Sequence, residues 1–471
     1  MKKLTTGNGC RPALSLHVME TPFPERGSEL WLGKPAPRYT SYPPAPFFTS
    51  DVGANAYANA LRQTAPDAPV SLYVHIPFCN SLCLYCGCNT IITNRAERIN
   101  PYLSALAQEM AHVGGLLGTR RVSHLHFGGG TPNALTDNQM RTIFEGIRTH
   151  FDLSSVGEIA MELDPRHVTP EQARTLVACG VSRVSLGAQD FNLEVQRTIN
   201  RVQPYELVAQ VCDWLREAGL TRINLDLMYG LPKQTPETIA DTARRVSALA
   251  PDRVALFSYA HVPSLKKHQK ALEAQGLPDL TTRLAMEQTA RQILTESGYA
   301  EIGIDHFAKP SDPLAKAWKN GQWHRNFQGY TEDSAETLIG LGVSAISQTP
   351  DGYFQGEHET GPYLEAVTAN RLPIRRGYLL TAEDRLRRAI IEALMCVLAC
   401  DLDALCAAHG FDVETLAEDL ARLRPYEEAG LVTREGFVIR LATERRMAVR
   451  AVCKEFDPHS RGSNLLSSRT A

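Results

Sequence analysis

Four cysteines lie within ten residues in the segment from Leu72 to Thr90, which reads LYVHIPFCNSLCLYCGCNT. They are Cys79, Cys83, Cys86 and Cys88. A C-x3-C-x2-C spacing cannot place every thiol on one side of a regular helix or strand, but a loop with this spacing can wrap around a compact metal centre. Because thiolates favour iron–sulfur clusters, zinc or Cu(I), the segment predicts a metal-binding loop.

The spacing leaves three interpretations of this loop. Three close cysteines suit a four-iron cluster in which three irons are held by thiolates and the fourth stays open. A structural zinc site needs four ligands, usually as two separated pairs, and Cys88 could be the fourth, so zinc remains an alternative. Cysteines buried without a metal are the third, but the neighbouring Asn80, Ser81 and Gly87 make the stretch polar and loop-like.

The elements that must position this loop alternate between strand and helix from residue 71 to 260. Helix starts are marked by Thr169-Pro170 and Thr235-Pro236. Six such repeats predict right-handed parallel crossovers, and therefore a doubly wound sheet or a partial or full barrel. The expected strands are Leu72–Ile76, Val122–Phe127, Glu158–Leu163, Arg183–Leu186, Arg222–Leu227 and Arg253–Tyr259.

Polar or glycine-rich residues follow the carboxyl end of each expected strand. The cysteine loop follows the first strand, and the turn Gly128–Pro132 follows the second. The others are Glu162 and Asp164, Gln189 and Asp190, Asp226, and Tyr259-Ala260. In a parallel barrel or sheet these ends form the active-site edge, so we expect the six sets of residues to lie together.

Each of these residues also has a simpler interpretation. The glycines can bring the main chain close to a ligand, or they can form a flexible turn. Glu162 can bind ribose hydroxyls or an amine, or be a surface carboxylate. Arg201 can pair with a ligand carboxylate, or be a solvated arginine at a helix end. His306 and His324 are ligand contacts or hydrogen-bonded structural histidines.

Composition narrows the class of protein. The chain has 471 residues, 43% of them hydrophobic, and a formal net charge of −3, which argues against binding to nucleic acid or a membrane surface. No apolar run reaches the ~18 residues of a membrane span, and no secretory signal is apparent. Eleven cysteines without a paired framework indicate a reduced protein, so we expect a cytoplasmic location.

Eight motifs together resemble the oxygen-independent coproporphyrinogen III oxidases, a family of radical S-adenosylmethionine enzymes. They are PRYTSYP, YVHIPFC with the following C..CGC, GGGTP, ELDPR, GAQDFN.EVQ..INR, NLDLMYGLPKQT, DHFAKP and HRNFQGYT. The resemblance covers residues 35 to 455. It implies an α/β fold, with a partial (β/α)6 barrel of the radical SAM type and a smaller, mostly helical C-terminal domain.

The sequence pattern and the resemblance together give the expected domain limits, and the resemblance implies the site residues. The expected parts are an irregular segment at 1–35, a strap at 36–70, the barrel and its extension at 71–375, the C-terminal domain at 376–455 and a tail at 456–471. A [4Fe–4S] cluster is implied on Cys79, Cys83 and Cys86, with Cys88 not a ligand. Two S-adenosylmethionine molecules are implied to contact Tyr73, Tyr85, Gly129, Gly130, Thr131, Glu162, Gln189, Arg201, Asp226, Ala260 and Ile346.

The implied reaction converts two propionates of coproporphyrinogen III to vinyl groups, giving protoporphyrinogen IX in haem synthesis, by a 5′-deoxyadenosyl radical. Because the substrate carries four carboxylates, Arg38 and Arg325 are predicted anchors. The expected partners are the tetrapyrrole and a flavodoxin-like reductant, and the protein is expected to be a monomer. A haem chaperone, a haem-modifying radical SAM methyltransferase and a zinc-binding structural module are the alternatives.

Overall fold

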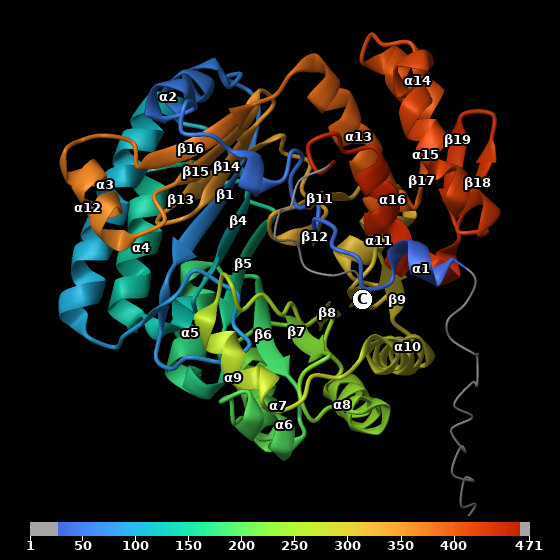
Figure 1. Cartoon of the computed structure of the whole chain (residues 1–471). Coiled ribbons are helices and arrows are strands. Elements are labelled where there is room, and N and C mark those ends of the chain that lie inside the picture. The colour runs from blue at the N-terminus through green and yellow to red at the C-terminus, as the bar shows by residue number, and fades with distance from the viewer. Residues whose placement is uncertain (1–26, 462–471) are drawn as a thin grey trace, which may run out of the picture.

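The structure is a computed structural model that describes residues 27–461, and its centre is a sheet of twelve strands. Six neighbouring strands run parallel, as the sequence predicts (Figure 1). They are β1 (Val70–Ile76), β4 (Val122–Gly129), β5 (Glu158–Leu163), β6 (Arg183–Gln189), β7 (Arg222–Tyr229) and β8 (Arg253–Ser258). Their carboxyl ends meet at one edge, as expected for parallel strands joined by helices.

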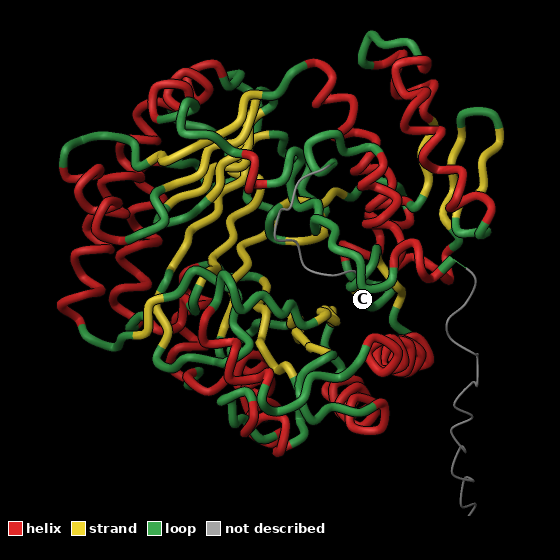
Figure 2. Tube along the Cα trace, viewed as in Figure 1, coloured by secondary structure: helices red, strands yellow, loops and turns green. Residues whose placement is uncertain are grey.

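Helices cover the outer side of this sheet (Figure 2). They are α3 (Ala96–Leu117), α4 (Asp137–His150), α5 (Pro170–Cys179), α6 (Leu193–Thr198), α7 (Tyr205–Glu217) and α8 (Pro236–Leu249). The predicted start signals are real: the hydroxyls of Thr169 and Thr235 accept hydrogen bonds from backbone amides in the first turns of α5 and α8. Gly180 ends α5 in the left-handed conformation at φ 95°.

The barrel is open, because its two outer parallel strands pair with other segments. On one side β1 pairs with β13 (Thr337–Leu341), and three antiparallel strands continue the sheet. These are β14 (Ile346–Thr349), β15 (Gly352–Gly356) and β16 (Ile374–Leu379). On the other side β8 pairs antiparallel with β10 (His306–Ala308), followed by β9 (Ala300–Ile302). The predicted partial (β/α)6 barrel is therefore confirmed.

The amino ends of the strands are fastened by buried ion pairs. Glu158 lies 2.9 Å from Arg183 and 2.6 Å from Arg222, and Arg253 lies 2.8 Å from Asp312. Burial opposes ionisation of Glu158, but the three surrounding arginines outweigh it and hold its pKa well below the ordinary value. This end of the barrel is a structural base, and the open edge lies opposite.

The C-terminal part packs around a second hydrophobic core. Its helices are α13 (Ala382–Val397), α14 (Leu402–Ala408), α15 (Ala417–Glu428) and α16 (Val449–Glu455). A small sheet holds β17 (Ala399–Asp401) and a hairpin of β18 (Val432–Glu435) and β19 (Val438–Leu441). Trp31, Tyr39 and Tyr42 join this core, so the strap packs against the C-terminal part as well as the barrel.

Four other helices and four short strands lie outside the groups named above. They are α1 (Ser28–Trp31), α2 (Ala54–Gln63), α9 (Lys270–Glu273), α11 (Pro313–Lys319), β2 (Phe78–Cys79), β3 (Ile91–Ile92), β11 (His324–Asn326) and β12 (Gly329–Thr331). Two further helices are α10 (Leu280–Glu296) and α12 (Thr360–Thr368). None of the described helices is long and apolar enough to pass through a membrane.

The two ends of the chain differ from the expected irregular segment and tail. Residues 28–31 form α1, which packs beside α16 (Figure 1). Phe456 and Asp457 are fully buried, and Tyr39 donates a 3.0 Å hydrogen bond to Asp457, so the chain does not become a tail at residue 456. The rest of the predicted end segments, 1–26 and 462–471, lies outside the described residues.

Candidate active site at the carboxyl ends of the strands

The cysteine loop begins directly after β1 and closes on itself. Strands β2 and β3 pair in parallel, with Cys79 opposite Ile92. Backbone hydrogen bonds from Ile91 to Pro77 (2.6 Å) and from Thr93 to Cys79 (2.9 Å) fasten the base of the loop. The loop therefore has a fixed frame before any metal is considered.

A glycine-rich turn at the end of β4 supports the loop from one side. The amides of Gly130 and Thr131 each donate a 2.8 Å hydrogen bond, to Ile76 and Phe78. A Cβ atom on Gly130 would lie 2.6 Å from the carbonyl oxygens of Pro77 and Phe78, closer than real Cβ contacts. Only glycine lets the two main chains approach this closely.

A second segment covers the loop from the opposite side. Lys266 Nζ donates to the Cys88 carbonyl at 2.6 Å, and the Gln269 amide donates to the Tyr85 carbonyl at 2.9 Å. His268 Nε2 lies 2.8 Å from the Cys86 carbonyl oxygen. The backbone carbonyls of the loop are therefore satisfied, which leaves its thiols as the groups available to a metal.

A cavity of about 540 Å³ lies over the cysteine loop, within the size range of small-molecule sites. All four loop cysteines line it. So do nine of the eleven residues predicted to contact S-adenosylmethionine: Tyr85, Gly129, Gly130, Thr131, Glu162, Gln189, Arg201, Asp226 and Ala260. The structure thus brings together residues from six different strand ends, as the sequence predicts.

The thiols fit a polynuclear cluster better than a single ion. Burial raises the pKa of Cys79 to about 12, so its thiolate form requires a cationic centre. A tetrahedral zinc ion with bonds of ~2.3 Å would draw its sulfurs within ~4 Å of one another. Among residues 27–461, only His124, Glu158 and Glu332 bring three potential metal-ligating atoms within 4.8 Å of one another, so the loop thiols are spaced more widely.

Arg201 contacts the cysteine loop rather than standing free in the cavity. Its Nη1 lies 3.4 Å from Cys83 Sγ and 3.2 Å from Asp164, and its Nη2 donates to the Gly187 carbonyl at 2.9 Å. Arg166 also binds Asp164, at 2.6 Å, and reaches Cys83 Sγ at 3.8 Å. Cys83 Sγ therefore lies within reach of two guanidinium groups that also share the Asp164 carboxylate.

Glu162 and Asp226 face the same cavity with opposite pKa shifts. Burial opposes ionisation of Glu162, but a 3.3 Å hydrogen bond with His126 and the nearby Gly129 amide lower its pKa below the ordinary value. Burial raises the pKa of Asp226 to about 6, and the negative charge of Glu162 adds to this rise. Of these two carboxyl groups, Glu162 therefore stays ionised and Asp226 is readily protonated.

Two predicted contact residues do not line this cavity. The hydroxyl of Tyr73 lies 3.0 Å from His75, and the Tyr73 ring stacks on His126, the partner of Glu162. Ile346 lies on β14 and packs in an apolar cluster with Phe327 and Tyr353. A role for Tyr73 and Ile346 in binding stays a prediction.

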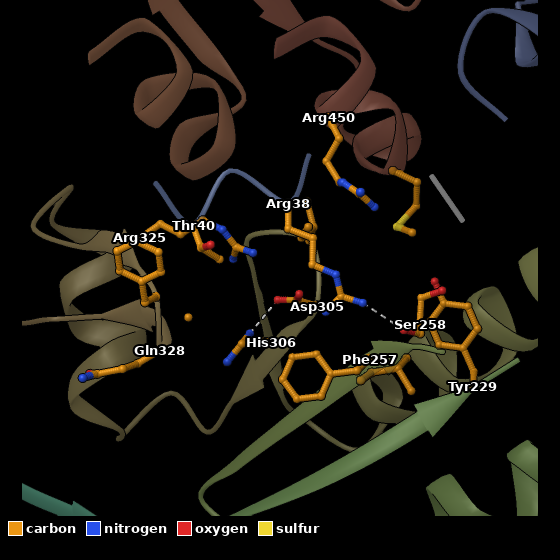
Figure 3. A pocket seen from close by; sticks show the side chains of 15 residues that line it. Arg38, Thr40, Tyr229, Phe257, Ser258, Asp305, His306, Arg325, Gln328 and Arg450 are labelled. Atoms are coloured by element: carbon orange, nitrogen blue, oxygen red, sulfur yellow. Dashed lines mark hydrogen bonds and ion pairs between the residues drawn. The ribbon is translucent and has the colours of Figure 1, made fainter. Parts of the chain in front are cut away.

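A second chamber of about 240 Å³ adjoins the first, and both are lined by Arg38, Phe257 and Ser258. Its described lining holds three arginines and one carboxylate, Asp305 (Figure 3). His306 Nδ1 lies 2.6 Å from Asp305. Burial opposes ionisation of Asp305, but His306 and the nearby arginines lower its pKa.

The three arginines come from distant parts of the chain. Arg38 lies on the strap, Arg325 on β11 and Arg450 on α16. Arg325 lies 4.6 Å from the centre of the Tyr330 ring, and its Nε and Nη1 have no hydrogen-bond partner among the described residues. Arg38 lines the chamber and is exposed to solvent, so its side chain faces a space that water can enter.

Sequence reasoning missed three residues here. Arg166 lies in the ELDPR motif two residues after Asp164, and this spacing is a local sign of an ion pair. Arg450 belongs to a row of cations at positions 446, 450 and 454, a spacing that places them on one helical face. Asp305 was visible only as the neighbour of His306 in DHFAKP, without a signal for its role.

Comparisons with known proteins match both parts of the chain. The radical SAM superfamily matches residues 73–246, and the HemN C-terminal domain matches residues 380–444. The oxygen-independent coproporphyrinogen III oxidase of Bradyrhizobium diazoefficiens is 44% identical over 434 residues, covering 92% of this chain and 96% of that protein. The Escherichia coli enzyme is 42% identical over 428 residues, covering 90% and 93%.

A solved structure is similar over nearly the whole described chain. It is the Escherichia coli coproporphyrinogen III oxidase HemN, described as a radical SAM enzyme, with a TM-score of 0.86 and 41% sequence identity over 89% of this chain and 97% of that one. The chain therefore belongs to the oxygen-independent coproporphyrinogen III oxidase family of the radical SAM superfamily.

Proposed function

We propose that this chain converts coproporphyrinogen III to protoporphyrinogen IX, by oxidative decarboxylation of two propionates in haem synthesis. The observation that carries this proposal is the arginine-lined chamber beside the cysteine-lined cavity. One site suits a metal cluster with its nucleoside, and the other suits a ligand with several carboxylates. Because both are lined by Phe257 and Ser258, a substrate held by the arginines lies next to the first cavity.

The cofactors are a [4Fe–4S] cluster and S-adenosylmethionine, of which the family binds two molecules. The residues that would hold the cluster are Cys79, Cys83 and Cys86, with Cys88 exposed beside them. When bound there, the cluster would supply the electron for reductive cleavage of S-adenosylmethionine, the chemistry that starts hydrogen abstraction from the substrate. Arg166 and Arg201 contact Cys83 Sγ and would orient this ligand toward the cluster.

The chain's own residues orient the nucleosides. The glycine turn after β4 presents backbone groups at the cavity wall, and Glu162 offers an ionised carboxylate to an amine or to ribose hydroxyls. Gln189, Asp226 and Ala260 line the same cavity. Tyr73 would act through its stack on His126, which holds Glu162 in place.

Arg38 and Arg325 are the proposed anchors for substrate carboxylates. Three guanidinium groups face one carboxylate in the chamber, so an anionic ligand relieves their mutual repulsion. Fixing two arms of the substrate aligns the propionate that reacts with the first cavity. Each reacting propionate loses carbon dioxide, one hydrogen atom and one electron, so the complete reaction also requires an electron acceptor.

We further propose a cytoplasmic monomer that receives electrons from a flavodoxin-like protein and acts on neither nucleic acid nor membranes. Free thiols at all ten described cysteines agree with a reducing compartment. The proposed domain limits are those expected from the sequence, except that the packed C-terminal part extends at least to residue 461. Sedimentation at several concentrations tests the monomer.

An anaerobic assay tests the function. The reconstituted protein is incubated with coproporphyrinogen III, S-adenosylmethionine and a reductant, and vinyl products and 5′-deoxyadenosine are measured. Formation of protoporphyrinogen IX supports the proposal. Haem binding without vinyl products would favour the chaperone, a methylated tetrapyrrole would favour the methyltransferase, and a zinc-loaded protein with no S-adenosylmethionine cleavage would favour the structural module.

A further inference from the structure

Three cationic side chains on the last helical segment donate hydrogen bonds to main-chain carbonyl groups in and beside the chamber walls. Arg446 lies on η6 (Thr443–Ala448), and Arg450 and Lys454 lie on α16, at successive i, i+4 positions. Arg446 donates to the Gly303 carbonyl at 3.0 Å. Lys454 donates to the Pro35 carbonyl at 3.2 Å. The row therefore connects the C-terminal part to two separate segments.

Arg450, in the middle of the row, holds the strap directly before Arg38. Its Nε donates to the Pro37 carbonyl at 2.9 Å, and its Nη2 donates to the Ala36 carbonyl. Because the prolines on either side of Ala36 keep the strap extended, these carbonyls do not take part in the local hydrogen bonds of a helix. A buried carbonyl needs a partner, and Arg450, itself only 9% exposed, supplies it.

The strap is also fixed on the other side of Arg38. Tyr39 turns sharply at φ 47°, and its hydroxyl donates to Asp457, just beyond α16. Arg38 is thus an exposed residue between two points where the strap is attached, one at Arg450 on α16 and one at Asp457 just beyond it. Its guanidinium extends from there into the chamber, where Nη2 donates to the Ser258 carbonyl at 3.4 Å (Figure 3).

Arg446 fixes the opposite wall of the chamber. It holds Gly303 through the carbonyl and Glu301 through a 2.6 Å ion pair. Gly303 precedes Asp305, the carboxylate of the chamber, by two residues. One helical face therefore sets the distance between the wall that carries Arg38 and the wall that carries Asp305.

We propose that Arg450 is a positioning residue: it holds the strap carbonyls so that Arg38 meets a substrate carboxylate, and the C-terminal domain thereby completes the substrate site. This inference rests on the proposed function and adds a specific residue to it. It predicts that loss of Arg450 weakens substrate binding through Arg38, while the cysteine loop and its cavity stay intact.

The test compares Arg450→Gln, Arg38→Ala and the double variant with the wild-type holoenzyme. Arg450→Gln is expected to raise KM for coproporphyrinogen III about tenfold, the effect of losing one charge-assisted contact. In Arg450→Gln, three quantities are expected to stay within twofold of wild type: the cleavage of S-adenosylmethionine without substrate, the iron content and the visible absorbance. Arg450→Lys keeps the positive charge and one donor nitrogen, so this variant is expected to recover part of the substrate affinity. Arg440→Gln, an exposed arginine of the same domain, is the matched control.

The KM of the double variant decides whether Arg450 acts by positioning Arg38 or by contacting the substrate separately. If Arg450 acts through Arg38, the double variant has about the KM of Arg38→Ala alone, whereas independent contacts multiply. An unchanged KM in Arg450→Gln, multiplicative effects, or an equal loss of S-adenosylmethionine cleavage would overturn the inference. Absence of vinyl products from the wild-type enzyme would instead reject the proposed function, so the two failures are distinguishable.

Discussion

Replacing Gly130 by alanine tests whether the glycine turn controls the cysteine loop. The added Cβ would lie 2.6 Å from the carbonyl oxygens of Pro77 and Phe78, and both are main-chain atoms that cannot rotate away. The turn must therefore shift away from the loop by ~0.5 Å or more. This shift strains the 2.8 Å hydrogen bonds from Gly130 to Ile76 and from Thr131 to Phe78. At ~0.5–1.5 kcal/mol each, their loss costs about 1–3 kcal/mol.

The assay measures two quantities on each variant. Urea unfolding of the apoprotein gives the loss of stability, and iron bound after anaerobic reconstitution gives the effect on the loop. Gly115→Ala is the matched control, because Gly115 lies within α3 and a Cβ there meets no atom within 4 Å. Since alanine favours helix over glycine by ~1 kcal/mol, this control is expected to gain stability and load iron normally. Equal stability and equal iron in Gly130→Ala and wild type would refute the reasoning.

Two further predictions concern buried carboxylates. Glu158→Gln leaves the arginines at the base of the barrel without their shared partner and should cost about 3–5 kcal/mol by urea unfolding at pH 7. Because the folded-state pKa of Glu158 is lowered, its contribution to the free energy of unfolding is present above the ordinary pKa of 4.5 and is lost as the pH falls below that value. The exposed Glu171→Gln is the control. A stability difference that does not depend on pH, or one no larger than that of the control, would contradict the prediction. Asp226→Asn removes a carboxyl whose pKa is raised to about 6 from an ordinary 3.8, so the variant should be more stable than wild type at pH 7 and equal to it at about pH 3.5. It should also bind S-adenosylmethionine more weakly by calorimetry, and unchanged affinity would remove Asp226 from the proposed site.

The sequence by itself determined the cysteine loop, the six parallel strands and the edge where their polar residues meet. These features depend on short-range patterns: thiol spacing, apolar runs, and Thr-Pro starts such as Thr169-Pro170 and Thr235-Pro236. Because parallel strands align their carboxyl ends, residues as far apart as Gly129 and Ala260 could be assigned to one cavity.

Only the tertiary structure decided which cations form the second chamber. Arg450 and the strap carbonyl that it binds are separated by 413 positions, and no local pattern links them. Their meeting depends on how the C-terminal core takes up Trp31 and Tyr39 from the other end of the chain. Likewise, the sequence suggested Arg201 as a contact for a ligand carboxylate, and only the fold shows that this arginine also contacts Cys83 and Asp164. Burial and main-chain hydrogen bonding fix such contacts, and both arise only when distant segments pack together.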